Sequence, residues 1–138
     1  MNRILITGGG GMLGKHLKEE FPEGYFPSRD EMNLLDYTSV VATIRHYQPT
    51  HVVHAAAKVG GIMDNINKPC DFLEENLLIN TNIIKAARIN NIPNLLCILS
   101  TCIFPDAVDN YPMDESMLFV GSPTSTNFSY GYAKRCRI

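Results

Sequence analysis

The chain has 138 residues, of which 45% are hydrophobic and 19% are charged, and its formal net charge is −2. This length allows one domain with a buried core, and the composition excludes an intrinsically disordered chain. The small net charge favours neither nucleic acid nor an acidic membrane surface as a partner. No apolar run approaches the ~20 residues that cross a bilayer, so we expect neither nucleic acid nor membrane among its partners.

The first residues and the cysteines bear on location and metal binding. The start, MNRILITGGG, predicts no signal peptide, because glycines interrupt its apolar stretch. No two cysteines form a CxxC pair, and we interpret all four as reduced thiols of a cytoplasmic protein. His51 and His54 have a strand spacing that points them to opposite faces, so no metal site is predicted. The cysteines are Cys70, Cys97, Cys102 and Cys136.

Apolar runs typical of strands alternate with helical segments along the chain. Strands are predicted at 3–7, weakly at 24–26, at 51–57 and, as a buried strand, at 95–99. Helices are predicted at 11–21, from a cap at Asp36 or Ser39 to about Tyr47, from Pro69 to about Ile89, and from 129 onward. The alternation predicts right-handed βαβ units, and therefore an α/β fold with a doubly wound parallel sheet of the Rossmann type.

Three glycines stand between the first strand and the first helix. Gly8, Gly11 and Gly14 have a GxxGxxG spacing within ITGGGGMLGKHL. Glycine permits a tight turn and a close approach to a pyrophosphate, and the helix N-terminus offers N–H groups and a positive dipole end. A flexible loop is the ordinary alternative, but the strand–turn–helix context favours a dinucleotide site.

The segment PSRDE, after the second predicted strand, bears on the choice of cofactor. The planar guanidinium of Arg29 suits the 2′-phosphate of NADP, whereas Asp30 could bind the ribose of NAD. A solvated turn would look the same, but the arginine comes first and we favour NADP. The small residues of HAAAKVGG, including Ala56 and Ala57, fit either a flat ligand across the sheet or close packing of strand on helix.

Tyr130 and Lys134 form a YxxxK pair, which places both side chains on one helix face. An ammonium near a phenol lowers the pKa of the phenol, so Tyr130 would exchange protons near neutral pH. Ser100 ends a predicted strand and could hydrogen-bond the same carbonyl oxygen. YxxxK alone usually marks a solvated helix face. Downstream of a dinucleotide loop, it predicts a reductase in which Tyr130 donates the proton, Ser100 orients the carbonyl and Lys134 also holds the ribose.

These motifs resemble the extended short-chain dehydrogenase/reductases. The segments RDEMNLLD, AAAKVGGI, STCIFPD, YPMDES and NFSYGYAK are similar to the GDP-L-fucose synthase family within that group, and the resemblance covers essentially the whole chain. It implies an NADPH-dependent 3,5-epimerase/4-reductase that converts GDP-4-keto-6-deoxy-D-mannose to GDP-L-fucose, and a homodimer at full length.

The resemblance also assigns roles to individual residues. Cys102 becomes an acid/base in epimerisation, because the 4-keto group acidifies the C–H bonds at C3 and C5. On composition alone, Cys102 would be a packed thiol at the edge of a core. The catalytic positions are Ser100, Cys102, Tyr130 and Lys134. The cofactor-binding positions are Gly8, Gly9, Gly10, Gly11, Met12, Leu13, Gly14, Arg29, Asp30, Asn33, Leu34, Ala56, Ala57, Ile98, Leu99, Ser100, Thr101 and Lys134.

One departure from the family limits what the chain is expected to do. The family's second epimerisation group is a histidine beyond the YxxxK helix, and none of His16, His46, His51 or His54 matches it. We expect residues 1–138 to be the amino-terminal part of an NADP-binding Rossmann domain, without its last strands and its substrate domain, and unable to complete the reaction. The alternatives are another nucleotide-sugar epimerase or dehydratase of this fold and a non-catalytic dinucleotide-binding module.

Overall fold

The computed structural model describes residues 2–108 and 110–138. Two compact units are present. The first unit comprises Met1–Ala57 and Leu78–Ile98, and the second comprises Lys58–Leu77 and Leu99–Ile138. Helix α4 (Pro69–Ile89), which begins and ends where the sequence predicts, contributes residues to both units.

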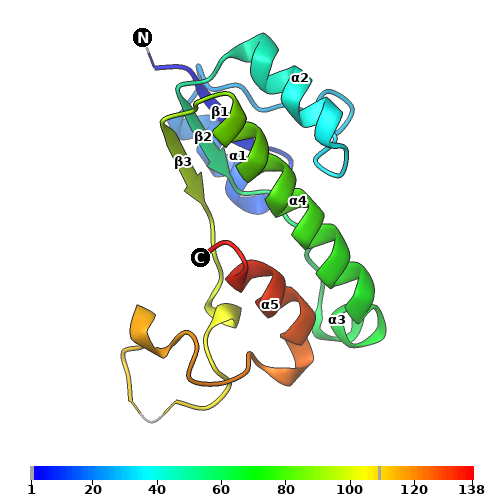
Figure 1. Ribbon diagram of the computed structural model, residues 1–138, viewed down its shortest axis with the longest axis vertical. Helices are drawn as coiled ribbons and strands as arrows, with labels where there is room; N and C mark the ends of the chain where they lie inside the picture. The colour runs from blue at the N-terminus through cyan, green and yellow to red at the C-terminus, as the bar shows by residue number, and fades with distance from the viewer. Residues whose placement is uncertain (1, 109) are drawn as a thin grey trace. The chain divides into compact units, whose positions relative to one another are not determined.

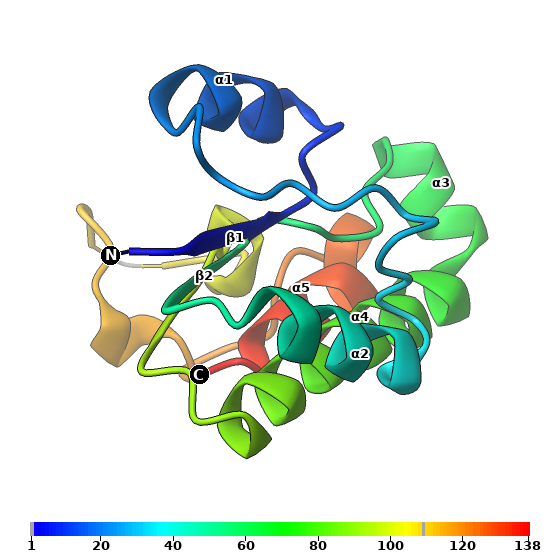
Figure 2. The ribbon, with the colours of Figure 1, turned by 90° about the horizontal axis from the view of Figure 1, so that it is seen from above.

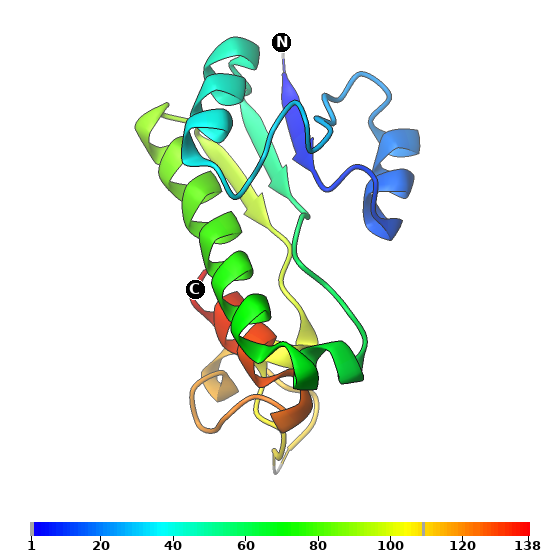
Figure 3. The same cartoon turned by 90° about the vertical axis from the view of Figure 1, so that its right-hand side faces the viewer.

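The first unit is built on a parallel sheet of three strands in the order β1–β2–β3. They are β1 (Ile4–Thr7), β2 (His51–His54) and β3 (Asn94–Cys97), and their arrows run the same way in Figure 3. Both strand pairs are parallel, as predicted. The carboxyl ends of the strands therefore meet at one edge of the sheet, where open α/β sheets bind ligands.

Helices cover both faces of this sheet (Figure 2). Helix α1 (Met12–Glu20) lies on one face, and α2 (Tyr37–Tyr47) lies on the other with the part of α4 that belongs to this unit. On the α2 side, the core includes one row of neighbouring strand residues, in which Leu5 pairs with Val52 and Val52 pairs with Leu95. The buried core residues are Leu5, Met32, Val40, Ile44, Val52, Ile83 and Ala86.

The strand predicted to be buried at 95–99 is instead exposed on one face. In the row that faces the α1 side, Ile6 is buried, Val53 is half-buried and Leu96 is 59% exposed. β1 and β3 are the two edge strands of the sheet, and α1 covers this face at the β1 edge. At β3, this face therefore has no cover within the described residues. β3 also ends at Cys97, two residues before the predicted end.

Other boundaries differ from the predictions for local reasons. The weak strand at 24–26 is reduced to one bridge, in which the N–H and the carbonyl of Tyr25 bond to β1, and Pro27 then has no N–H to continue the ladder. β2 ends at His54 because the N–H of Ala56 donates to the Thr7 hydroxyl instead of to a strand. Asp36 caps α2 as predicted, whereas Ser39 lies inside the helix.

The second unit consists of short elements. Helix α3 (Ile62–Asn67), which the sequence did not predict, packs against α5 (Phe128–Arg135) and the turn η3 (Ser125–Asn127). α5 also packs against the turn η1 (Thr101–Ile103), as Figure 1 shows. A third turn, η2, spans Glu115–Met117. α5 ends at Arg135 and not at the last residue.

Candidate active site

The glycine loop of the first unit is specified by steric contacts. Gly8 has a φ of +79°, and a Cβ there would lie 2.9 Å from the backbone nitrogen of Ala56. A Cβ on Gly14 would overlap the carbonyl oxygen of Gly8. Any side chain at either position would therefore displace the turn from the strand end or from the helix. Gly10, in contrast, has open space where its Cβ would be.

The same loop presents the N-terminus of α1. The N–H of Gly11 donates to the Gly8 carbonyl at 3.0 Å, and Gly11 stands at the N-cap with no side chain to occupy the first turn. Met12 and Leu13, the first helical residues, are exposed. Because the first N–H groups of a helix have no intrahelical acceptor, this arrangement fits the pyrophosphate of a dinucleotide.

A buried hydrogen-bonded chain supports the loop from the strand ends. The Thr7 hydroxyl oxygen accepts the N–H of Ala56 at 3.2 Å and lies 2.8 Å from Nδ1 of His54. A hydroxyl can take part in more than one hydrogen bond, so Thr7 bonds the backbone of Ala56 and the imidazole of His54 at the same time. Thr7 and His54 thus hold the ends of β1 and β2 together. The alanines of HAAA lie where Gly8 approaches their backbone closely, which favours the packing interpretation of these small residues.

The segment predicted to select the cofactor is an exposed turn. Arg29 and Asp30 are both exposed. The turn is held at its ends, because Ser28 N–H donates to Glu31 at 2.7 Å and Glu31 N–H donates to the Ser28 hydroxyl. The bond from the Ser28 backbone also lowers the pKa of Glu31. The guanidinium of Arg29 is therefore accessible to a phosphate.

Two other predicted cofactor residues have structural contacts. The side-chain oxygen of Asn33 accepts the N–H of Leu35 at 3.1 Å. Leu34 packs against the core, and its carbonyl accepts Nδ2 of Asn82 at 2.8 Å. These contacts shape the turn between the bridge residue Tyr25 and α2.

The residues that follow β3 lead into the candidate catalytic cluster. Ile98 donates its N–H to the His54 carbonyl at 3.0 Å in the first unit. In the second unit, Leu99 and Thr101 are exposed and Ser100 is half-buried. The Ser100 hydroxyl accepts the N–H of Cys102 at 3.2 Å, which caps η1 and turns the chain there.

The second unit brings Ser100, Cys102 and Tyr130 together. The pKa of Tyr130 is raised above its ordinary value, mainly by burial and next by the negative charge of the Cys102 thiolate. A side-chain hydrogen bond with Ser100 and the charge of Arg137 act in the opposite direction. Tyr130 is therefore protonated at neutral pH and can donate a proton.

The pKa of Tyr130 is raised in this structure, where the sequence predicted a value near neutrality, and the contribution of Lys134 stays a prediction. Lys134 is 3% exposed, and its Nζ lies 5.5 Å from the centre of the Tyr130 ring, over the ring face. Burial is the largest influence on the pKa of the phenol, and a side-chain hydrogen bond with Ser100 and then the charge of Arg137 oppose it. Tyr132 has different neighbours, since its ring lies against that of Phe128 with the ring centres 4.6 Å apart and the ring planes tilted by 60°.

Sequence reasoning missed three residues of this cluster. A Cβ on Gly131 would lie 2.5 Å from the Cys102 carbonyl oxygen and 2.8 Å from Pro123 Cβ, so this glycine lets α5 approach η1. Asn127 donates to the Cys102 sulfur at 3.3 Å. Arg135 is buried and donates to the Ile103 carbonyl. A glycine inside a predicted helix was the available signal, because it costs about 1 kcal/mol relative to alanine and needs a reason.

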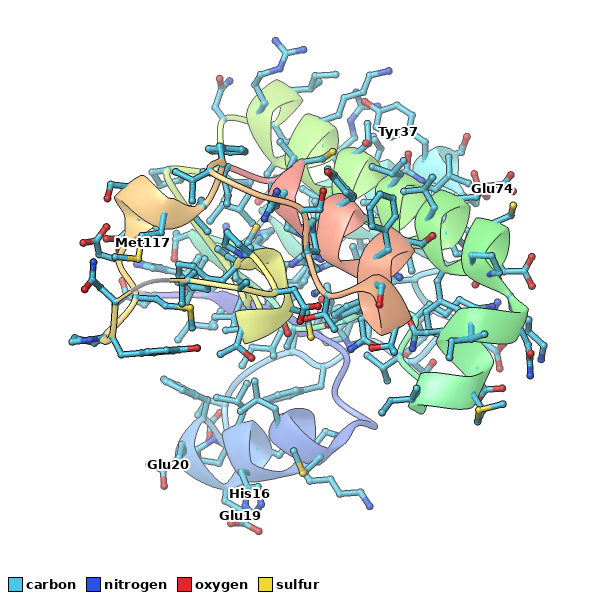
Figure 4. The ribbon with its side chains drawn as sticks, turned by 90° about the horizontal axis from the view of Figure 1, so that it is seen from below. His16, Glu19, Glu20, Tyr37, Glu74 and Met117 are labelled. Carbon is cyan, nitrogen blue, oxygen red and sulfur yellow. The ribbon has the colours of Figure 1, made fainter. Side chains whose placement is uncertain are left out.

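Several features of the described residues lie outside this site. No group of three or more His, Cys, Asp or Glu side chains in this part of the chain could hold a metal ion. His16 lies on the face of α1 that points away from the sheet (Figure 4), 3.8 Å from Glu19. Within the described residues, the four cysteines form no disulfide. No helix in residues 2–108 or 110–138 has both the length and the apolar character needed to cross a bilayer.

Comparison with protein families decides where the chain belongs. Residues 4–138 match the NAD dependent epimerase/dehydratase family. The chain belongs to this family. Its members at high similarity include a probable GDP-L-fucose synthase of Drosophila melanogaster, 42% identical over 98% of this chain and 44% of the relative. A GDP-L-colitose synthase of Yersinia pseudotuberculosis is 40% identical over 96% of this chain and 44% of the relative.

A solved structure of the family extends the comparison. The GDP-L-fucose synthetase of Naegleria fowleri bound to NADP has a TM-score of 0.85 and 34% identity, over 99% of this chain and 42% of that chain. These findings confirm the Rossmann fold class and the resemblance to GDP-L-fucose synthases. This member of the epimerase/dehydratase family spans less than half the length of the relatives it matches.

Proposed function

We propose that this chain is the cofactor-binding part of an NADPH-dependent 3,5-epimerase/4-reductase that converts GDP-4-keto-6-deoxy-D-mannose to GDP-L-fucose. The observation that carries the proposal is the cluster of Ser100, Cys102 and Tyr130 within one unit. It contains a hydrogen-bonding hydroxyl, a thiol and a protonated phenol. Similarity to GDP-L-fucose synthases over nearly the whole chain supports the same assignment.

The proposed cofactor is NADP(H), bound by residues of the first unit. The loop from Gly8 to Gly14 has room for a pyrophosphate because its glycines leave no side chain between strand and helix. Arg29 is exposed and would pair with the 2′-phosphate. The Naegleria relative binds NADP. Bound NADPH would supply the hydride for reduction at C4 of the sugar.

The proton chemistry is assigned to the second unit. The Cys102 thiolate takes a proton from C3 or C5, and the electron pair of the C–H bond moves into the 4-keto group to form an enolate. Ser100 and Tyr130 hydrogen-bond the oxygen that gains the negative charge. In the reduction step, Tyr130 gives its proton to that oxygen. Because burial, and next the Cys102 thiolate, raises the pKa of Tyr130, the phenol keeps its proton while the sulfur acts as a base.

Further aspects of the proposal concern partners and location. The substrate is a nucleotide sugar, and no nucleic acid or membrane is assigned as a partner. We assign a cytoplasmic location, which fits cysteines that form no disulfide within the described residues. The full-length protein is assigned as a homodimer. The partly exposed Leu73 and Leu78 on α4 are compatible with a second copy.

A second candidate is the formation of another GDP-L-sugar by the same cluster. The GDP-L-colitose synthase relative favours it, because its identity of 40% is close to the 42% of the fucose synthase relative. The two candidates share the GDP group and differ in the sugar. Product analysis with each keto-sugar separates them.

The test uses the protein that carries this chain, at its natural length. It is incubated with GDP-4-keto-6-deoxy-D-mannose in D₂O, and deuterium at C3 and C5 is followed by NMR. We expect exchange before NADPH is added, and GDP-L-fucose after it. Cys102→Ser should slow exchange by about a hundredfold, because it removes a positioned base, and should leave NADPH binding intact. Cys136→Ser, at an exposed free cysteine, is the matched control. Unchanged exchange in the Cys102 variant would remove the thiol from the mechanism.

A further inference from the structure

Asn127 stands at the N-cap of α5 without capping it. Asparagine is among the preferred N-cap residues, because its side-chain oxygen accepts an N–H of the first turn. At α5 the structure shows no hydrogen bond of this kind from Asn127. The side-chain oxygen of Asn127 is buried and has no hydrogen-bond partner within the described residues. Asn127 therefore does not give α5 the stabilisation that a capping side chain would provide.

The amide of Asn127 is directed at the sulfur of Cys102. Its Nδ2 donates to Cys102 Sγ at 3.3 Å, across 25 positions of sequence. η3, which contains Asn127, and η1, which contains Cys102, both adjoin α5. We infer that Asn127 is a positioning residue that fixes the direction of the Cys102 sulfur and favours its thiolate form.

The chemistry of the two groups decides which protonation state of Cys102 forms the stronger hydrogen bond with Asn127. The NH₂ of an amide can only donate, and a neutral thiol is a weak acceptor. A thiolate is a charged acceptor, and hydrogen bonds to charged groups are stronger. The bond is therefore stronger when the sulfur is ionised, which is the form that acts as a base.

Other ionisable groups surround the two turns. They are Tyr130, Tyr132, Lys134 and Arg135 of α5, Arg137 just after α5, and Asp64 of α3. Among them, Tyr130 interacts electrostatically with Cys102, and a thiolate there opposes a phenolate. Asn127 would thus help to decide which of the two groups carries the negative charge. The inference deepens the proposed function and rests on it for the catalytic value of the thiolate.

The test measures the thiol directly, in the protein that carries this chain at its natural length, without cofactor or sugar. Cys102 is alkylated with iodoacetamide at pH 7 and at pH 10, and the modified peptide is quantified by mass spectrometry against that of Cys70, an exposed free cysteine. For each variant, the Cys102 rate at pH 7 is divided by the Cys102 rate at pH 10, after each has been normalised to the Cys70 rate at the same pH. This ratio reports the thiolate fraction of Cys102 at pH 7 and cancels changes in its access. We expect Asn127→Ala to lower this ratio about tenfold, from the loss of a hydrogen bond to a charged acceptor. Asn127→Asp should lower it further, because a carboxylate repels the thiolate.

The controls keep the result decisive. Ser125→Ala changes an exposed residue of the same turn and should leave the ratio unchanged. If Asn127→Ala fails to fold, Asn127→Asp still decides, since aspartate is a good N-cap residue. An unchanged or higher ratio in the Asn127 variants would overturn the inference. Deuterium exchange into the sugar tests the proposed function separately, so the two can fail independently.

Discussion

The glycine loop of the first unit and the cysteine–tyrosine cluster of the second are held by different kinds of contact. In the loop, backbone atoms pack directly against backbone atoms, and a Cβ added at Gly8 or Gly14 would overlap them. In the cluster, side chains from separate short elements are joined by hydrogen bonds, as between Asn127 and Cys102. The loop therefore depends on the absence of side chains at its glycines, whereas the cluster depends on hydrogen bonds between specific side chains.

This difference determines what each region tolerates. Overlap of backbone atoms cannot be relieved by a change of rotamer, so the loop should respond abruptly to substitution. Side-chain hydrogen bonds can be lost one at a time, and each typically contributes about 1 kcal/mol. The cluster should therefore respond in graded steps. Gly131 gives the cluster a steric contact of the kind found in the loop.

The largest effect is expected for Gly14→Ala in the loop. The new methyl would overlap the Gly8 carbonyl and crowd Gly9. We expect a loss of about 2 kcal/mol in the free energy of unfolding, since overpacking outweighs the helix-propensity gain of about 1 kcal/mol. NADPH binding should fall below detection, because the turn that presents α1 is displaced. Urea unfolding and NADPH fluorescence titration measure the two effects.

Gly10→Ala is the matched control for this variant. A Cβ at Gly10 meets no atom within 4 Å, and its φ is not positive. We expect stability to be unchanged or slightly higher, because alanine restricts the unfolded chain. A normal affinity of Gly14→Ala for NADPH, or an equal loss in both variants, would contradict the steric account of the loop.

The first unit could be predicted from the sequence to a large extent. Its strands are short apolar runs, its turn residues are glycines and Asp36 caps α2, so each local preference agrees with the fold. The prediction failed at β3, because periodicity shows that a strand is apolar and not which face is covered. Leu96 reads as a core residue in sequence and is exposed in the structure.

The second unit was predictable in its residues and not in its geometry. Ser100, Cys102 and Tyr130 were identified from motif and resemblance, but the bonds that join them depend on turns too short to show a period. The pKa of Tyr130 is the clearest case. The i, i+4 spacing indicated that Lys134 controls it, whereas burial, which depends on tertiary packing, has the larger effect.

Gly131→Ala should give the next largest effect. Its methyl would lie 2.5 Å from the Cys102 carbonyl, and α5 would have to move away from η1. We expect a net loss of about 1 kcal/mol in stability, because the gain in helix propensity offsets part of the clash. Deuterium exchange into the keto-sugar should fall at least tenfold, while NADPH binding by the first unit persists. Gly61→Ala, where a Cβ meets nothing within 4 Å, is the control in the same unit. Full exchange activity in Gly131→Ala would show that the close approach of α5 is not needed.

The smallest effect expected is a shift in tyrosine titration, and it compares the two units directly. Tyr25 in the first unit and Tyr130 in the second both have a pKa raised above 10.0, mainly by burial. The folded state holds these protons longer than the unfolded state, so their contribution to stability is complete below pH 10 and is lost as pH rises through the folded pKa. Only Tyr130 owes part of its shift to Cys102. In Cys102→Ser, the pKa of Tyr130 should fall and that of Tyr25 should not. Absorbance of the phenolates at alkaline pH, assigned with Tyr25→Phe and Tyr130→Phe, measures both. If the two pKa values change together, or if that of Tyr130 does not change, the prediction is contradicted. The substitution removes the charge of the Cys102 sulfur, so either result would mean that this charge does not raise the pKa of Tyr130.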